Sequence, residues 1–125
     1  MQNKWELGKI GEHIAENYLT KNDYQIVGRN FRLRNGEIDI IAIENTNSKD
    51  KTLVFFEVKT RTTKDFGTPL EAITRFKLRA LIRAAQVYKL SHKNLPDAMR
   101  IDALAIIVMP TGELVNLEHV RNISS

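Results

Sequence analysis

The stretch LVFFEVKTR, Leu53–Arg61, joins an apolar run to three charged residues at every second position. Side chains alternate between the two faces of a strand, so Glu57, Lys59 and Arg61 point to one face. An unbroken apolar run predicts a strand in the interior of a sheet. We therefore expect a central strand whose charged end reaches the surface.

Length and composition predict one globular domain covering residues 1–125. Hydrophobic residues make up 42% of the chain and charged residues 27%, which excludes a disordered chain. The net charge of +4 allows a polyanionic partner such as nucleic acid but does not require one.

Several classes of protein are excluded by composition. The chain contains no cysteine, so disulfides, thiolate nucleophiles and cysteine-based metal centres are ruled out. The N-terminal residues lack the apolar core of a signal peptide, and no apolar run approaches the roughly 20 residues needed to cross a bilayer. We expect a cytoplasmic protein with no membrane partner. The sequence allows a homodimer without requiring one.

Hydrophobic periodicity and turn signals predict the order αβββαββ. The expected elements are a helix at about residues 5–19, strands at 24–34, 36–43 and 52–60, a helix at 68–91, and strands at 99–109 and 113–120. The pair Asn35-Gly36 is typical of a tight hairpin turn. Thr68-Pro69-Leu70-Glu71 has the layout of a capped helix start. The order predicts an α/β fold with a mixed central sheet flanked by helices.

The loop at residues 45–51 sets the register of the second and third strands. If the hairpin is centred on Ser48, Asp39 lies opposite Glu57. Facing carboxylates repel each other, so this register needs something to offset the repulsion. A hard divalent cation such as Mg²⁺ would do so, and it also contacts phosphate oxygens. Lys59 would then orient an attacking water or stabilise the developing negative charge.

Ordinary ion pairs are the alternative interpretation of these charges. A two-residue Asn35-Gly36 turn would place Arg34 opposite Glu37 and Arg32 opposite Asp39, and Lys59 could pair with the neighbouring glutamates. On the first helix Glu12 shares its face with small residues, which suggests that another backbone passes close by. Both interpretations stay open at this point.

Basic residues on the second helix are candidates for nucleic-acid contacts. Arg75, Arg79 and Arg83 recur every four residues and form one ridge, which is also compatible with a solvated face. Lys77 lies within the apolar stripe, so it must snorkel or point into a charged pocket. Beyond the third strand, Arg61 and Lys64 are placed to meet a DNA backbone.

Two further groups of polar residues have structural interpretations. Arg100 and Asp102 enter a buried strand, for which we favour a structural ion pair over a role at the site. His13, His92 and His119 show no metal-ligand spacing and are interpreted as incidental.

Five motifs resemble the bacterial YraN-like family: GKIGEHIAENYL, RNFR, GEIDIIA, VFFEVKTR and FKLRALIRAA. The resemblance runs from about residue 9 to residue 108. That family looks like a minimal member of the restriction-endonuclease-like, or PD-(D/E)XK, nuclease superfamily and is similar to archaeal Holliday-junction resolvases. The superfamily's αβββαβ core agrees with the predicted order of elements.

The resemblance implies a Mg²⁺- or Mn²⁺-dependent endonuclease acting on DNA, with branched or structured DNA among its substrates. Asp39 and Glu57 would bind the metal with the carbonyl of Val58, Lys59 would be the catalytic lysine, and Glu12 would support the metal or its water. The superfamily's usual proline before the aspartate is replaced here by Ile38. A non-catalytic nucleic-acid-binding module and an adaptor protein are the alternatives.

Overall fold

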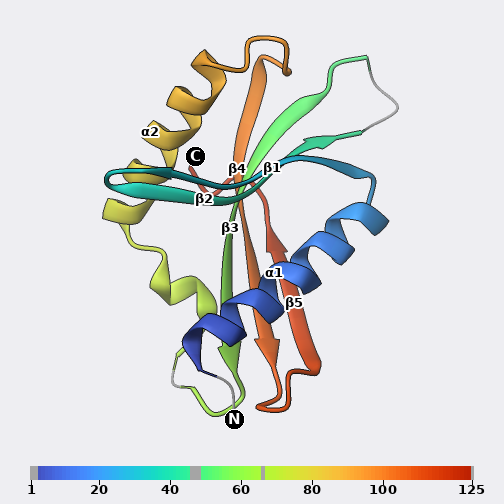
Figure 1. Cartoon of the computed structure of the whole chain (residues 1–125), viewed down its shortest axis with the longest axis vertical. Coiled ribbons are helices and arrows are strands. Elements are labelled where there is room, and N and C mark those ends of the chain that lie inside the picture. The colour runs from blue at the N-terminus through green and yellow to red at the C-terminus, as the bar shows by residue number, and fades with distance from the viewer. Residues whose placement is uncertain (1–2, 46–48, 66, 125) are drawn as a thin grey trace.

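The fold was examined in a computed structural model that describes residues 3–45, 49–65 and 67–124. The elements, in chain order, are α1 (Lys4–Lys21), β1 (Tyr24–Leu33), β2 (Gly36–Glu44), β3 (Thr52–Thr62), the short 3-10 helix η1 (Pro69–Ala72), α2 (Arg75–Leu90), β4 (Ala98–Val108) and β5 (Leu114–Val120). The predicted order αβββαβ with an extra C-terminal strand is confirmed (Figure 1).

In the described residues the strands form one five-stranded sheet in the order β1-β2-β3-β4-β5. β3 and β4 are parallel, and the other neighbouring pairs are antiparallel, so the sheet is mixed. The parallel pair is joined through η1 and α2, as a crossover connection requires. Within the described part of the chain, no helix is long and apolar enough to span a membrane.

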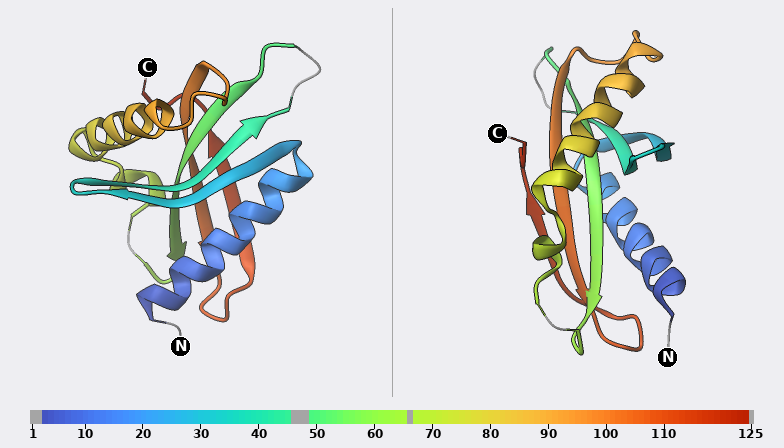
Figure 2. Two further views of the ribbon diagram at one scale, coloured as in Figure 1. Left: turned by 45° about the horizontal axis from the view of Figure 1, so that its top comes forward. Right: turned by 90° about the vertical axis from the view of Figure 1, so that its left-hand side faces the viewer.

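Strand β3 separates two apolar clusters, one under each helix. Val54 and Phe56 pack in the cluster that includes Ala15 and Leu19 of α1. The alternate residues of β3 pack in a second cluster with the buried face of α2 (Figure 2). The pattern LVFF is apolar throughout because both faces of this strand are covered, as expected for a central strand.

The β1–β2 hairpin forms where predicted, but its turn lies one residue earlier in the chain, so each residue of β1 near the turn pairs two residues earlier in β2 than predicted. Leu33 pairs with Gly36 and Arg32 with Glu37, so the turn residues are Arg34 and Asn35. The expected pairing of Arg32 with Asp39 is therefore wrong. Gly36 is the first residue of β2, and a Cβ there would come within 2.9 Å of the Ala80 carbonyl oxygen of α2, so the position favours glycine.

The predicted β2–β3 register is confirmed, since Ile40 pairs with Phe56 and Ile41 with Phe55. The ladder ends at the Ile40–Phe56 pair, one step before Asp39 would meet Glu57. Beyond that point the closed end of the β1–β2 hairpin swings away from β3 toward α2 (Figure 1). The predicted hairpin centre, Ser48, lies outside the described residues.

The second helix is shorter than the predicted range 68–91. The Pro69 start produces only the turn η1, and Thr68 makes no capping hydrogen bond with its side chain. Ile73 and Thr74 are extended, which separates η1 from α2. The Thr74 side chain caps α2 by accepting a hydrogen bond from the N–H of Lys77 at 3.2 Å. The helix start predicted at Thr68 is therefore wrong, and Thr74, which was not predicted as a cap, starts the helix.

Candidate functional site

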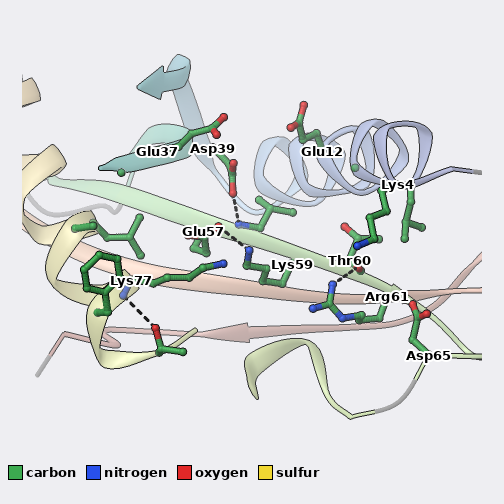
Figure 3. A pocket seen from close by; sticks show the side chains of 18 of the residues that line it. Lys4, Glu12, Glu37, Asp39, Glu57, Lys59, Thr60, Arg61, Asp65 and Lys77 are labelled. Carbon is green, nitrogen blue, oxygen red and sulfur yellow. Dashed lines mark hydrogen bonds and ion pairs between the residues drawn. The ribbon is translucent and has the colours of Figure 1, made fainter. Parts of the chain in front are cut away.

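A cavity of about 970 Å³ lies where α1, the start of β2, the end of β3 and the start of α2 meet. The residues predicted to be catalytic or metal-binding all line it: Glu12, Asp39, Glu57, Val58 and Lys59. Arg61 and Lys77 also line it. The structure therefore gathers side chains from both helices and two strands around one space (Figure 3).

The β2–β3 ladder ends at Ile40, so Asp39, the preceding residue in the chain, lies outside the ladder and lines this cavity. An oxygen of its carboxyl group accepts a hydrogen bond from the N–H of Val58 at 2.7 Å. This side chain thus satisfies a backbone donor of β3 where the ladder has ended. Asp39 is consequently fixed beside the stretch that carries Glu57 and Lys59.

The environment of Asp39 disfavours a negative charge. Burial is the main cause that raises the pKa of its carboxyl group to about 8, and the nearby Glu57 carboxyl adds to the rise. The Val58 N–H acts in the opposite direction. Glu57 is itself only 8% exposed. Two acids therefore lie next to each other, and no positively charged group is among the main influences on the pKa of Asp39.

Lys59 lies beside the acid pair and Lys77 lies beside Lys59. The Lys59 Nζ atom is 3.7 Å from a carboxyl oxygen of Glu57. The nearby ammonium group of Lys59 is the main cause that lowers the pKa of Lys77, and burial adds to this effect. Lys77 thus points from the end of the apolar stripe of α2 into the charged cavity (Figure 3).

Glu12 approaches the site from α1, which packs on the other face of β3. Burial raises its pKa, the pairing with Lys9 at 3.8 Å lowers it, and Asp39 raises it further. The helix comes close to β3 at Gly11, where an added Cβ would overlap the Thr60 side-chain oxygen. At Gly8 nothing lies within 4 Å of such a Cβ, so the expected close backbone is absent there.

Glu37 also lines the cavity, although it was not predicted as a site residue. It pairs with Arg32 at 3.3 Å and contributes to the raised pKa of Asp39. Its position two residues before Asp39 on the same strand was the available signal. Because Arg32 pairs with Glu37, it does not neutralise Asp39 as the ion-pair interpretation required.

The donor atoms at the acid pair are carboxyl oxygens, which suit a hard cation such as Mg²⁺. Among the described residues no group of three or more His, Cys, Asp or Glu side chains is arranged to hold a metal ion. Mg²⁺ needs fewer protein ligands, since it is commonly held by one or two carboxylates and keeps several waters. The pair of half-buried Asp39 and buried Glu57 fits that requirement, and added positive charge would offset its repulsion.

The remaining basic candidates lie outside the cavity lining. Arg75, Arg79 and Arg83 are exposed on α2, and Lys64 is exposed after β3. They are exposed to solvent and are not part of the cavity lining. Arg61 is the exception, since it lines the cavity while its guanidinium donates a hydrogen bond to the Thr60 carbonyl oxygen at 3.1 Å.

The predicted ion pair of Arg100 and Asp102 is confirmed, with Nε and Oδ1 2.8 Å apart. The interpretation of His119 as incidental is wrong. Its ring is hydrogen-bonded to Asp102 at 2.8 Å and to the Tyr18 hydroxyl of α1 at 2.8 Å. Burial alone would raise the pKa of Asp102, but hydrogen bonds from His119, Arg100 and the Asn122 N–H lower it to about 2.

The same network continues to Glu44 at the end of β2. Its carboxylate accepts hydrogen bonds from Arg100 at 3.0 Å, from Arg121 at 2.7 Å and from the Tyr24 hydroxyl at 2.9 Å. None of these residues lines the cavity. The buried charges in the described part of the chain thus form two separate groups. One is internally neutralised and structural, and the other is the acid pair at the cavity.

Fold and site together define a mixed α/β protein in which an acid–lysine cluster lines a cavity at the point where two strands diverge. The chain belongs to the family described as "Uncharacterised protein family UPF0102", whose model matches residues 11–106. The resemblance to the YraN-like family is confirmed at this level.

Curated relatives match the chain over nearly all of its length. A UPF0102 protein of Renibacterium salmoninarum is 40% identical over 123 residues, which cover 98% of this chain and 99% of the relative. One from Leifsonia xyli subsp. xyli is 43% identical over 107 residues, 86% of each chain. One from Dictyoglomus thermophilum is 37% identical over 122 residues, 98% of each chain.

Proposed function

We propose that this protein is a Mg²⁺- or Mn²⁺-dependent endonuclease that hydrolyses phosphodiester bonds of DNA, within the PD-(D/E)XK superfamily. The observation that carries the proposal is the pair of half-buried Asp39 and buried Glu57 beside Lys59, open to a cavity of about 970 Å³. Two neighbouring acids destabilise the folded state, and groups with such a perturbed pKa are often part of a functional site. A divalent cation and a phosphate are the partners that suit it.

Each residue has a role that follows from its position. Asp39 and Glu57 would hold the cation, with the Val58 carbonyl as a further oxygen ligand. Glu12 would accept a hydrogen bond from a water of the site. The chemistry that bound Mg²⁺ supplies is neutralisation of phosphate charge and a lower pKa of a bound water. Lys59 would stabilise negative charge as it develops on the phosphate.

The absence of the superfamily's usual proline has a structural explanation. Ile38, the residue at that position, is fully buried and packs in the cluster under α2. The position therefore serves the core in this fold. The acid that follows is fixed instead by the hydrogen bond from the Val58 N–H.

Cleavage of DNA with Mn²⁺ present tests the proposal. Duplex, single-stranded, flapped and four-way substrates are compared for the wild type, Lys59→Ala and the control Lys21→Ala, which removes an exposed lysine outside the cavity. We expect Lys59→Ala to lower the cleavage rate by roughly a hundredfold or more and Lys21→Ala to leave it unchanged. Failure to cleave any substrate, or equal cleavage by Lys59→Ala, would contradict the proposal.

The exposed ridge of Arg75, Arg79 and Arg83 supports a second candidate, a non-catalytic nucleic-acid-binding module. This candidate predicts binding that weakens with salt, that needs no metal, and that falls when the three arginines are replaced. Binding without cleavage in the assay above would favour it. Failure to bind any nucleic acid would favour a protein adaptor instead.

A further inference from the structure

Phe76, in the first turn of α2, combines high exposure with a position at the site. Its side chain is 72% exposed, and it lines the cavity. The other large exposed hydrophobic side chains of the described residues, among them Trp5, Leu90 and Val115, do not line it. Packing explains little of this placement, because the buried stripe of α2 consists of other residues. The ring is therefore available to a ligand.

Lys59 and Lys77 lie close together at the cavity. In Figure 3 they lie on the opposite side of β3 from the carboxylates of Glu12, Glu37 and Asp39, while Glu57 is 3.7 Å from Lys59. Phe76 and Lys77 follow each other in the first turn of α2, and both line the cavity together with Lys59. A flat aromatic face beside ammonium groups is the combination with which proteins bind single-stranded nucleic acid.

The chemistry of stacking decides what this combination can bind. A base inside a continuous duplex already has both of its faces stacked on neighbouring bases, so an aromatic side chain has no free face to contact. An unpaired base offers its face, and every base type has one. A single aromatic ring beside phosphate-binding lysines therefore favours unpaired nucleotides without reading their sequence.

We propose that Phe76 is a stacking platform for an unpaired base, and that the substrates of the site are single-stranded DNA or the splayed and flapped ends of duplexes. Lys77 and Lys59 hold the adjoining phosphate next to the acid pair. This inference rests on the proposed function in one respect, namely that nucleic acid enters this cavity. It goes further by excluding continuous duplex as the preferred substrate.

The test is the binding of fluorescently labelled DNA, measured by anisotropy without divalent metal so that no cleavage occurs. The ligands are a single strand of about ten nucleotides, a splayed duplex and a blunt duplex. We expect Phe76→Ala to weaken binding of the first two by roughly five- to 150-fold and to leave the blunt duplex nearly unchanged. Phe76→Trp, which keeps an aromatic face, should bind like the wild type.

Trp5→Ala is the matched control, because Trp5 is 70% exposed and outside the cavity lining. It should bind every DNA like the wild type. Salt dependence separates the two kinds of contact. Phe76→Ala should lower affinity by the same factor at all salt concentrations, whereas Lys77→Ala should reduce the slope of log K against log salt by about 0.7.

The stacking proposal is overturned if Phe76→Ala leaves single-strand binding unchanged or weakens the blunt duplex equally. Cleavage measured separately keeps the two proposals apart. Cleavage together with binding that does not depend on Phe76 would remove the platform and leave the nuclease. Binding that depends on Phe76 without cleavage would leave the platform on a non-catalytic protein. Binding of no DNA at all would contradict the platform and assign the exposed ring to a protein partner.

Discussion

The carboxyl group of Asp39 meets two opposing influences at one position. The Val58 N–H donates a hydrogen bond to it, which favours the charged form. Burial and the Glu57 carboxyl favour the neutral form more strongly, and the pKa is raised to about 8. A positive charge nearby would therefore stabilise the ionised form of this carboxyl group. We propose that a bound divalent cation supplies that charge.

The raised pKa of Asp39 predicts how stability depends on pH. The unfolded chain releases the proton near pH 4, and the folded chain holds it until about pH 8. Between these values the folded state binds the extra proton, so the free energy of unfolding falls as the pH rises. From pH 5 to pH 9 we expect the wild type to lose on the order of 4 kcal/mol more than Asp39→Asn does, since about three pH units of the window lie below the folded pKa.

Urea denaturation of both proteins at the two pH values, without divalent metal, measures this difference. Asparagine is a suitable replacement because its amide oxygen can still accept the hydrogen bond from Val58. A loss of stability that is the same in wild type and Asp39→Asn would show that Asp39 titrates normally. It would also remove the charge repulsion on which the metal site is argued.

The sequence predicted the β2–β3 register better than the register of the β1–β2 hairpin before it. The alternation in β3 and the length of the loop after β2 were enough to bring Asp39 next to Glu57. The β1–β2 register was not predictable, because Gly36 was interpreted as a turn residue. Its actual role is to let Ala80 of α2 approach, a contact between segments far apart in the chain.

Helix α1, which carries Glu12, contains two glycines with different surroundings. Gly11 faces the side chain of Thr60 at a distance that leaves no room for a methyl group, whereas Gly8 faces open space. The sequence suggested only that another backbone passes close to the small residues on the face of Glu12. Only the position of β3 beneath the helix distinguishes them.

Alanine substitutions at these glycines should have opposite effects. Gly11→Ala should lower the free energy of unfolding by about 1–3 kcal/mol, because the new methyl group overlaps Thr60 and forces α1 away from β3. Gly8→Ala should raise it by about 0.5–1 kcal/mol, because alanine is the better helix former and meets nothing. Urea denaturation at neutral pH measures both.

The two variants are each other's control, since they make the same change three residues apart on one helix. Destabilisation of similar size in both would contradict the close packing of α1 on β3 at Gly11. The split of the second helix into η1 and α2 is a comparable case at this scale. The sequence predicted a start at Thr68, but Thr68 makes no capping hydrogen bond, and the helix begins after Thr74, whose side chain does.

Across the whole molecule, the buried charges in the described residues serve two purposes at different places in the sheet. The network around Asp102 and Glu44 joins α1, β1, β2, β4 and the C-terminal residues, and its charges balance. The Arg100–Asp102 pair was predictable from two charges entering an apolar strand. The partnership with Tyr18 and His119 was not, because these residues are 101 positions apart and meet only in the folded sheet.

In the acid pair at the cavity Glu57 has Lys59 as an ion-pair partner, whereas no positive group is among the main influences on Asp39. The central claim is that this pair binds a divalent cation. Calorimetric titration with Mn²⁺ at pH 7 tests this most directly, with Asp39→Asn as the site variant and Asp97→Asn as a control at an exposed acid outside the cavity. We predict one bound ion in wild type and Asp97→Asn, with release of a proton held by Asp39. We predict at least about tenfold weaker binding in Asp39→Asn. No binding by the wild type, or equal binding by Asp39→Asn, would contradict the account.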